Sequence, residues 1–243
     1  MGGYYFLRCA LPHLPNVLGE VMPAAFGEIS GMIRRNVDPE DEHLFCLVLQ
    51  AIDVVNWEWL DQGRPVFIEG GTTKREDLKG SPQTLPLFIR AFHEERERVG
   101  RRGYLYDRLW ERYLGELFAA AQEVGNSFLL MYLPWEIGLR NSLTALKCKE
   151  RGLNIEEHIV LPQIQSRDPA SVLSHATTLR DPLQIEHYLD EERLKAVFRA
   201  EGADPFSFDA VLAYAVRAMI YSRWDRMRLP FGFRAFLYDG GST

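Results

Sequence analysis

The feature that most constrains the fold is a long helical pattern near the middle of the chain, residues 126–152. A capping residue begins it, either Asn126 or Ser127, and Gly152 ends it. At about 100° per residue, its apolar side chains fall on one stripe, formed by Leu129, Tyr132, Leu133, Leu139 and Leu143. Pro134 lies inside the pattern, so we expect it to kink the helix or to end a first segment.

This apolar stripe also carries two charged residues. Glu136 lies at its centre, and Arg140 follows one helical turn later. A carboxylate buried alone would be costly, but the i,i+4 spacing lets Glu136 meet Arg140 directly. The first interpretation of Glu136 and Arg140 is therefore a buried structural ion pair.

The alternative is an enzyme that uses Glu136 as a catalytic acid beside an anion-binding Arg140, assisted by His93 or His158. No nucleophile with a base accompanies this pair. Each histidine stands alone, without the spacing of a metal motif. The Gly- and Thr-rich stretch 70–74 lacks the spacing of a phosphate-binding loop. We therefore expect no catalytic, cofactor-binding or metal site.

Composition narrows the class of protein. The chain is 47% hydrophobic and 26% charged, which suits a folded soluble protein, and its net charge of −6 does not suggest a nucleic-acid binder. Three widely spaced cysteines, Cys9, Cys46 and Cys148, argue against a disulfide framework. The longest apolar run, Phe128 to Leu133, is far shorter than the roughly 20 residues of a membrane span. We expect a cytoplasmic protein that reaches a membrane only through partners.

Helix-start signals recur along the chain. Three helices are expected where an Asp or Ser cap precedes proline, at Asp38, Ser81 and Asp181. The other long helices are expected over Val17 to Arg35, Tyr104 to Glu123 and Ser207 to Arg228, with short helices after Asn154 and Asp168.

The remaining segments are predicted to be irregular or extended. Tyr4 to Leu11 can be a short strand or an extended segment, Gly63 to Gly80 a loop that can hold one helical turn, and Gly232 to Thr243 a frayed tail. Strand-like alternation is almost missing from the sequence. We therefore predict an all-α multi-helix bundle, a single helical domain over 1–243 that allows a sub-division near 63–81.

Two polar residues interrupt the apolar face of the helix that follows Asp38. Asp53 and Asn56 lie three residues apart on a face beside the apolar stripe. They can cap or bridge another segment, or they can lie at a solvated edge. The sequence leaves both interpretations open.

Four ordered segments resemble one family. Trp135-Glu136, followed by Leu139-Arg140-Asn141, Leu146 and Lys149 to Gly152, resembles the helix pattern of the C subunit of V/A-type ATPases. It is more closely similar to a bacterial family of short proteins, related to that C subunit and associated with V-type ATP synthase. The other three segments are Tyr4 to Leu7 with Leu11-Pro12, then Ile52 to Asn56, and then Ser207-Phe208 with Ala213-Tyr214 and Arg223-Trp224-Asp225.

The resemblance implies an all-helical, non-catalytic subunit without cofactors. Such a protein would couple the central stalk to the membrane rotor ring in ion or proton transport, and the other subunits of V-type ATP synthase would be its partners. The chain is shorter than an ordinary C subunit, and its candidate repeats, Asp53 to Asn56 and Glu136 to Asn141, do not superimpose. Whether it replaces the ordinary C subunit or accompanies it therefore stays open. A free-standing helical interaction or regulatory module is the second hypothesis.

Overall fold

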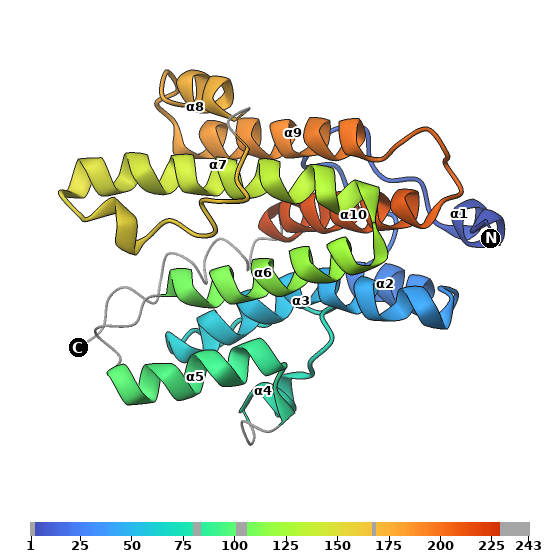
Figure 1. Cartoon of the computed structure of the whole chain (residues 1–243). Helices are drawn as coiled ribbons and strands as arrows, with labels where there is room; N and C mark the ends of the chain where they lie inside the picture. The colour runs from blue at the N-terminus through green and yellow to red at the C-terminus, as the bar shows by residue number, and fades with distance from the viewer. Residues whose placement is uncertain (1–2, 80–83, 101–105, 167–168, 229–243) are drawn as a thin grey trace.

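The computed structural model describes residues 3–79, 84–100, 106–166 and 169–228, and all regular secondary structure in these ranges is helical (Figure 1). The predicted all-α fold class is confirmed. The α-helices are α1 (Tyr5–Ala10), α2 (Phe26–Arg34), α3 (Pro39–Asp61), α4 (Arg75–Lys79), α5 (Leu87–Val99), α6 (Tyr106–Val124), α7 (Ser127–Arg151), α8 (Ala170–Ala176), α9 (Pro182–Ala200) and α10 (Phe208–Arg228). A 3-10 helix, η3, covers Ile155–Glu157.

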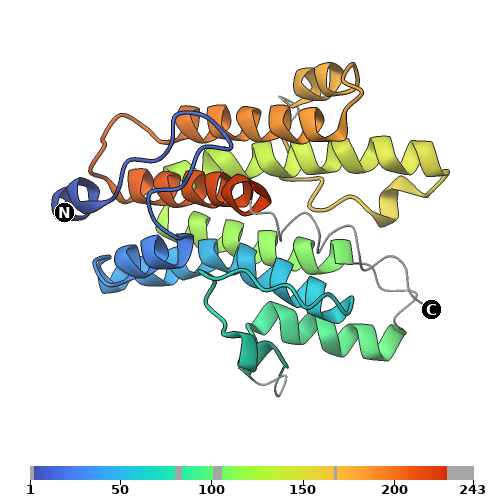
Figure 2. The ribbon, with the colours of Figure 1, turned by 180° about the vertical axis from the view of Figure 1, so that it is seen from behind.

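The long helices form two layers. One layer holds α2, α3, α5 and α6, from the first half of the chain, and the other holds α7, α9 and α10, with α8 on its outer side (Figures 1 and 2). Contacts of α6 with α7, and of α10 with α2 and α3, join the layers. In the first layer the long helix is α3 and in the second it is α7. In both layers, a loop and then further helices follow the long helix along the chain.

A continuous apolar core runs through both layers. Its largest fully buried side chains come from helices α2, α3, α5, α6, α7 and α10, and they are Phe45, Phe92, Phe128, Ile29, Ile33, Leu49, Ile89, Leu109, Leu129, Ile137, Leu139 and Leu212. Helix α10 buries residues on several sides, including four alanines, because it lies between α9, α7, α2 and α3. None of the described helices combines the length and apolarity that a bilayer-spanning segment requires.

The ends of α7 lie where the sequence predicts them. The side chain of Asn126 accepts a hydrogen bond from the Leu129 N–H at 2.9 Å, and Gly152 adopts a left-handed φ of 66°. Helix α7 nevertheless runs through Pro134 without interruption. Of the two effects expected of Pro134, termination of a first segment is therefore wrong.

The N-terminal region differs from the prediction. Tyr4 to Leu11 contains helix α1, not a strand, and it buries Leu7 and Leu11 one turn apart. The helix expected over 17–35 begins only at Phe26. Residues 11–25 instead cross α10 (Figure 2), and Gly19 within them has a φ of 89°.

Hydrogen bonds explain why this segment is not helical. The Tyr214 hydroxyl on α10 donates to the Pro12 carbonyl at 2.7 Å, and the Met22 N–H donates to Asp225 at 3.4 Å. Tertiary contacts with α10 therefore outweigh local helix propensity. The helix start expected at Ser81, the cap at Asp168 and the tail from Gly232 lie outside the described residues.

Candidate functional site

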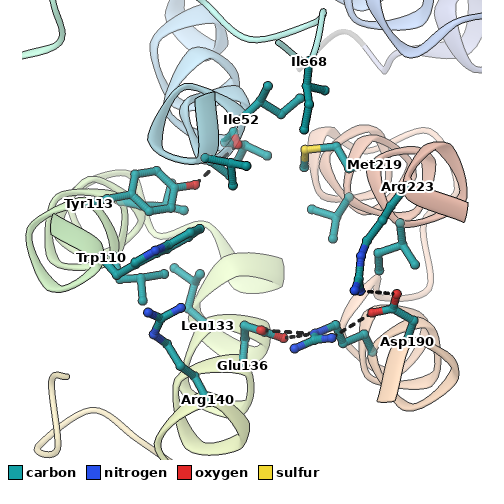
Figure 3. Close-up of a pocket in the computed structure, with 18 of the residues that line it drawn as sticks. Ile52, Ile68, Trp110, Tyr113, Leu133, Glu136, Arg140, Asp190, Met219 and Arg223 are labelled. Atoms are coloured by element: carbon teal, nitrogen blue, oxygen red, sulfur yellow. Dashed lines mark hydrogen bonds and ion pairs between the residues drawn. The ribbon is translucent and has the colours of Figure 1, made fainter. Parts of the chain in front are cut away.

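A cleft of about 610 Å³ lies between the two layers (Figure 3). Helices α3 and α6 form one side of it, and α7, α9 and α10 form the other. Most of its wall is apolar or aromatic, for example Ile52, Trp110, Tyr113, Leu133 and Met219. The volume falls within the range of ligand-binding clefts, so this cleft is the candidate site.

An ion-pair network crosses the α7–α9 side of the cleft. The Nε atom of Arg193 on α9 donates to both carboxylate oxygens of Glu136 on α7, at 3.2 and 3.0 Å. Its Nη1 donates to Asp190 at 2.7 Å. Burial lowers the pKa of Arg193, but the charges of Glu136 and Asp190 outweigh burial and raise that pKa above its usual value. Arg193 therefore remains charged and ties α7 to α9.

Asp190 is the centre of this network. Its side chain is 2% exposed, and it accepts hydrogen bonds from Arg223 Nη1 at 2.7 Å and from the Trp224 indole at 2.8 Å. Arg223 and Trp224, which the motifs singled out, thus reach Glu136 through Asp190 and Arg193. Asp190 was not predicted from the sequence, although its i,i+3 spacing to Arg193 on α9 was a signal for it.

The expected direct ion pair between Glu136 and Arg140 is wrong. Arg140 Nη2 instead donates to Asp107 on α6 at 3.3 Å, and its guanidinium lies 4.7 Å from the centre of the Trp110 ring. Glu136 pairs with a residue of α9 and Arg140 with a residue of α6. These contacts between helices are made in place of the expected i,i+4 contact along α7. Burial lowers the pKa of Arg140, and the nearby carboxylates oppose that effect.

Asp53 and Asn56 bind the loop that follows α3, so the bridging interpretation is correct and the solvated edge is wrong. Both side chains are fully buried. Asp53 accepts from the Thr72 N–H at 3.0 Å, the Thr72 hydroxyl at 2.6 Å and the Thr73 N–H at 3.1 Å. The Gly- and Thr-rich stretch is therefore held by a carboxylate of its own chain. A Cβ atom on Gly71 would lie 2.2 Å from Asp53 Oδ1, which leaves no room for a side chain.

Asn56 and Asn141 form the same contact in the two layers. Asn56 donates to the Ile68 carbonyl at 2.8 Å and accepts from the Ile68 N–H at 2.7 Å. Asn141 on α7 donates to the Val160 carbonyl at 2.7 Å and accepts from the Val160 N–H at 2.9 Å. These motif residues therefore satisfy buried backbone groups and do not face the cleft. Trp135 is likewise a core residue, 6% exposed.

The cleft holds few groups for covalent or acid–base chemistry. The described residues that line it include no Ser, Thr, Cys, His or Lys. His158 lies apart from it, with Nδ1 2.9 Å from Asp107, and His93 packs near Trp57. Within the described ranges, no three His, Cys, Asp or Glu side chains are grouped to hold a metal ion. The arrangement can bind apolar groups and can hold helices in register.

Comparison with known proteins corrects the expected family. A family model described as "Protein of unknown function (DUF2764)" matches residues 1–237, almost the whole chain. This match overturns the predicted membership of the family related to the V/A-type ATPase C subunit, because the four ordered motifs are short and the whole-length match is to another family. No curated protein matches the chain.

Proposed function

We propose that this chain, which belongs to the family described as "Protein of unknown function (DUF2764)", is a non-catalytic helical protein that works by binding other proteins. The observation that carries the proposal is that two carboxylates of the cleft are already paired with donors of the same chain. Glu136 and Asp190 are saturated by Arg193, Arg223 and Trp224. Carboxylates paired in this way hold neighbouring helices together.

The partner we propose is V-type ATP synthase, with the chain as a subunit or accessory protein between the central stalk and the rotor ring. The order of the sequence motifs supports this choice, although they do not place the chain in the C-subunit family. A protein in that position must resist torque, and close-packed helices with internal ion pairs are stiff. It would lie on the cytoplasmic side and meet the membrane through the complex.

Co-purification tests the partner. A tagged full-length chain should recover stalk and ring subunits from gently solubilised membranes. Membranes that lack the stalk and ring subunits serve as the control, because proteins recovered there would come from a different complex. Recovery of no ATP synthase subunit from membranes that contain the enzyme would contradict the proposed partner.

The second hypothesis, a free-standing regulatory module, predicts a different result. A deletion strain would then assemble an ATP synthase that pumps ions at the parent rate. Under the first hypothesis, the same deletion should lower ATP-driven pumping in isolated vesicles. The rate of ion pumping therefore distinguishes the two hypotheses. The short length of the chain is the reason for considering the second one.

A further inference from the structure

The cleft between the layers has an apolar end and a charged end. Helices α3, α7 and α10 run in the same direction (Figure 1). On each of them, the first residue that lines the cleft is apolar and a charged residue follows about two to three turns later, namely Val48 and Glu58, Leu129 and Glu136, and Val216 and Arg223. Helix α9 lines the cleft only with charged residues, Glu186, Asp190 and Arg193. The wall therefore changes from apolar to charged along the length of the cleft.

The two ends also differ in their exposure to solvent. At the apolar end, Leu129 is 1% exposed and Val48 is 2% exposed. At the charged end, the side chains of Arg223 and Glu186 are 40% and 48% exposed. A molecule that fills the cleft therefore needs an apolar part, which leaves water, and a polar part that remains near it.

The charges of the cleft do not favour a ligand with a net charge. Four arginines and four carboxylates line it, namely Arg140, Arg193, Arg223 and Arg226 with Glu58, Glu136, Glu186 and Asp190. The carboxylates of Glu58 and Glu136 act on Arg140, and that of Asp225 acts on Arg226. An anionic group placed beside Arg140 would therefore also meet two carboxylates, and a cationic group would meet the arginines.

One hydrogen-bond donor of this wall has no acceptor among the described residues. The Nε atom of Arg140 is buried, and it makes no hydrogen bond within the ranges that the structure describes. A buried N–H group without an acceptor is costly, and an uncharged oxygen of a ligand would satisfy it without adding charge.

The length of the cleft suits one short hydrocarbon chain. From Val48 to Glu58, helix α3 rises by roughly 15 Å. Carbon atoms in an extended chain advance by somewhat less than a bond length of about 1.5 Å, so roughly ten to twelve carbons fit along this distance. The volume of about 610 Å³ is within the range of pockets for small molecules.

We propose that the cleft binds an uncharged single-chain amphiphile of the monoacylglycerol type. Its acyl chain would lie along the apolar end, between α3, α6, α7 and α10. An oxygen of its head group would accept a hydrogen bond from Arg140 Nε at the charged end. This site is separate from any surface that binds a protein partner.

Titration calorimetry of the full-length chain tests the position of the acyl chain. The probe is monolaurin, used below the concentration at which it forms micelles. Ala51→Phe narrows the apolar half of the cleft, because Ala51 lines it one turn after Val48. Ala119→Phe is the matched control, since Ala119 is exposed on α6 and is not among the lining residues. We expect Ala51→Phe to weaken binding at least roughly tenfold and Ala119→Phe to leave it unchanged.

A second comparison tests the head group. Arg140→Lys keeps the positive charge beside Asp107 but removes the Nε donor. It should weaken binding of monolaurin about three- to tenfold, the value of one hydrogen bond. It should not weaken binding of dodecyltrimethylammonium, whose head has no acceptor oxygen. A purely structural role of Arg140 would change the affinity for both probes.

The outcomes that contradict the proposal are distinct. It is overturned if monolaurin does not bind, or if the two phenylalanine variants weaken binding equally. Tighter binding of laurate than of monolaurin would overturn the uncharged head group. Circular dichroism checks that the variants fold, and Val55→Phe is the substitute if Ala51→Phe does not. None of these measurements depends on V-type ATP synthase, so they can fail or succeed independently of the proposed partner.

Discussion

The loop after α3 and the loop after α7 are bound by the same kind of contact, but with different supporting chemistry. We call Asp53 and Asn56 with residues 68–73 the first loop latch, and Asn141 with residues 160–166 the second loop latch. In each, one buried asparagine exchanges two hydrogen bonds with the backbone of one loop residue. The first latch adds a buried carboxylate, whereas the second adds the Gln165 amide oxygen at 2.8 Å from Asn141 Nδ2.

The two latches also use glycine differently. In the first, Gly71 lies in the loop and makes room for the Asp53 carboxylate. In the second, Gly138 lies in α7, and a Cβ atom there would be 2.2 Å from the Ser166 carbonyl oxygen. The Ser166 N–H donates to the Pro134 carbonyl at 2.8 Å, so the loop backbone rests directly on the helix. In both layers a loop is held on a long helix. In the first layer a buried carboxylate holds it, and in the second the loop backbone packs directly against a glycine of the helix.

The largest effect is expected from Asp53→Ala in the first latch. It leaves two loop N–H groups and one hydroxyl without their acceptor, so we expect a loss of about 3–5 kcal/mol in the free energy of unfolding. Urea denaturation measures the loss, and Asp38→Ala is the control, because Asp38 makes no side-chain cap bond to α3. If Asp53→Ala costs no more than Asn141→Ala, the first latch is not the stronger of the two.

Asn56→Ala and Asn141→Ala should each cost about 2–4 kcal/mol, since each strands a buried N–H and a buried C=O. The two latches share no partner, so the double variant should show the sum within about 0.5 kcal/mol. Asn36→Ala is the control, because Asn36 is exposed and its side chain donates within its own turn, to the Met32 carbonyl at 2.8 Å. A strongly non-additive double variant would mean that the two loops are coupled through the core.

The helices could be predicted from the sequence more fully than the contacts between side chains of different helices. Caps and prolines located the starts of α3, α7 and α9 because those signals act within one turn of the chain. Asp53 and Asn56 could be singled out because polar residues beside an apolar stripe need partners. The partner of Arg140 could not be predicted, because residue spacing along α7 does not show which side chain of α6 lies opposite Arg140. Asp190 has one donor at i,i+3 on its own helix, but the two that make it the centre of the network, Arg223 and Trp224, lie on α10 and could not be foreseen from spacing.

Gly138→Ala tests the close approach in the second latch. The added methyl group would meet a backbone oxygen, which cannot rotate away, so we expect a loss of about 1–3 kcal/mol. Gly115→Ala is the matched control on α6, where the nearest atom to an added Cβ is 3.8 Å away. That change should stabilise the protein by about 0.5–1 kcal/mol, because alanine favours a helix interior. Thermal denaturation of both variants would show shifts of opposite sign; shifts of the same sign would refute the close contact.

The smallest effect, a dependence on pH, should separate the charged latch from the neutral one. Burial raises the pKa of Asp53 above its ordinary value of 3.8, and the hydrogen bonds from Thr72 and Thr73 oppose that rise. A raised pKa means that the folded protein binds the proton more tightly than the unfolded chain does. The resulting stability is fully present below pH 3.8 and is lost as the pH rises through the folded-state pKa of Asp53.

The difference in unfolding free energy between the parent and Asp53→Asn isolates this effect from other acids. Measured by urea denaturation from acid to neutral pH, it should decrease as the pH rises. The difference between the parent and Asn141→Ala should stay constant over the same range, because no group of the second latch titrates there. A curve that climbs with pH would show that the hydrogen bonds from the loop outweigh burial, and a flat curve would show that the two effects cancel.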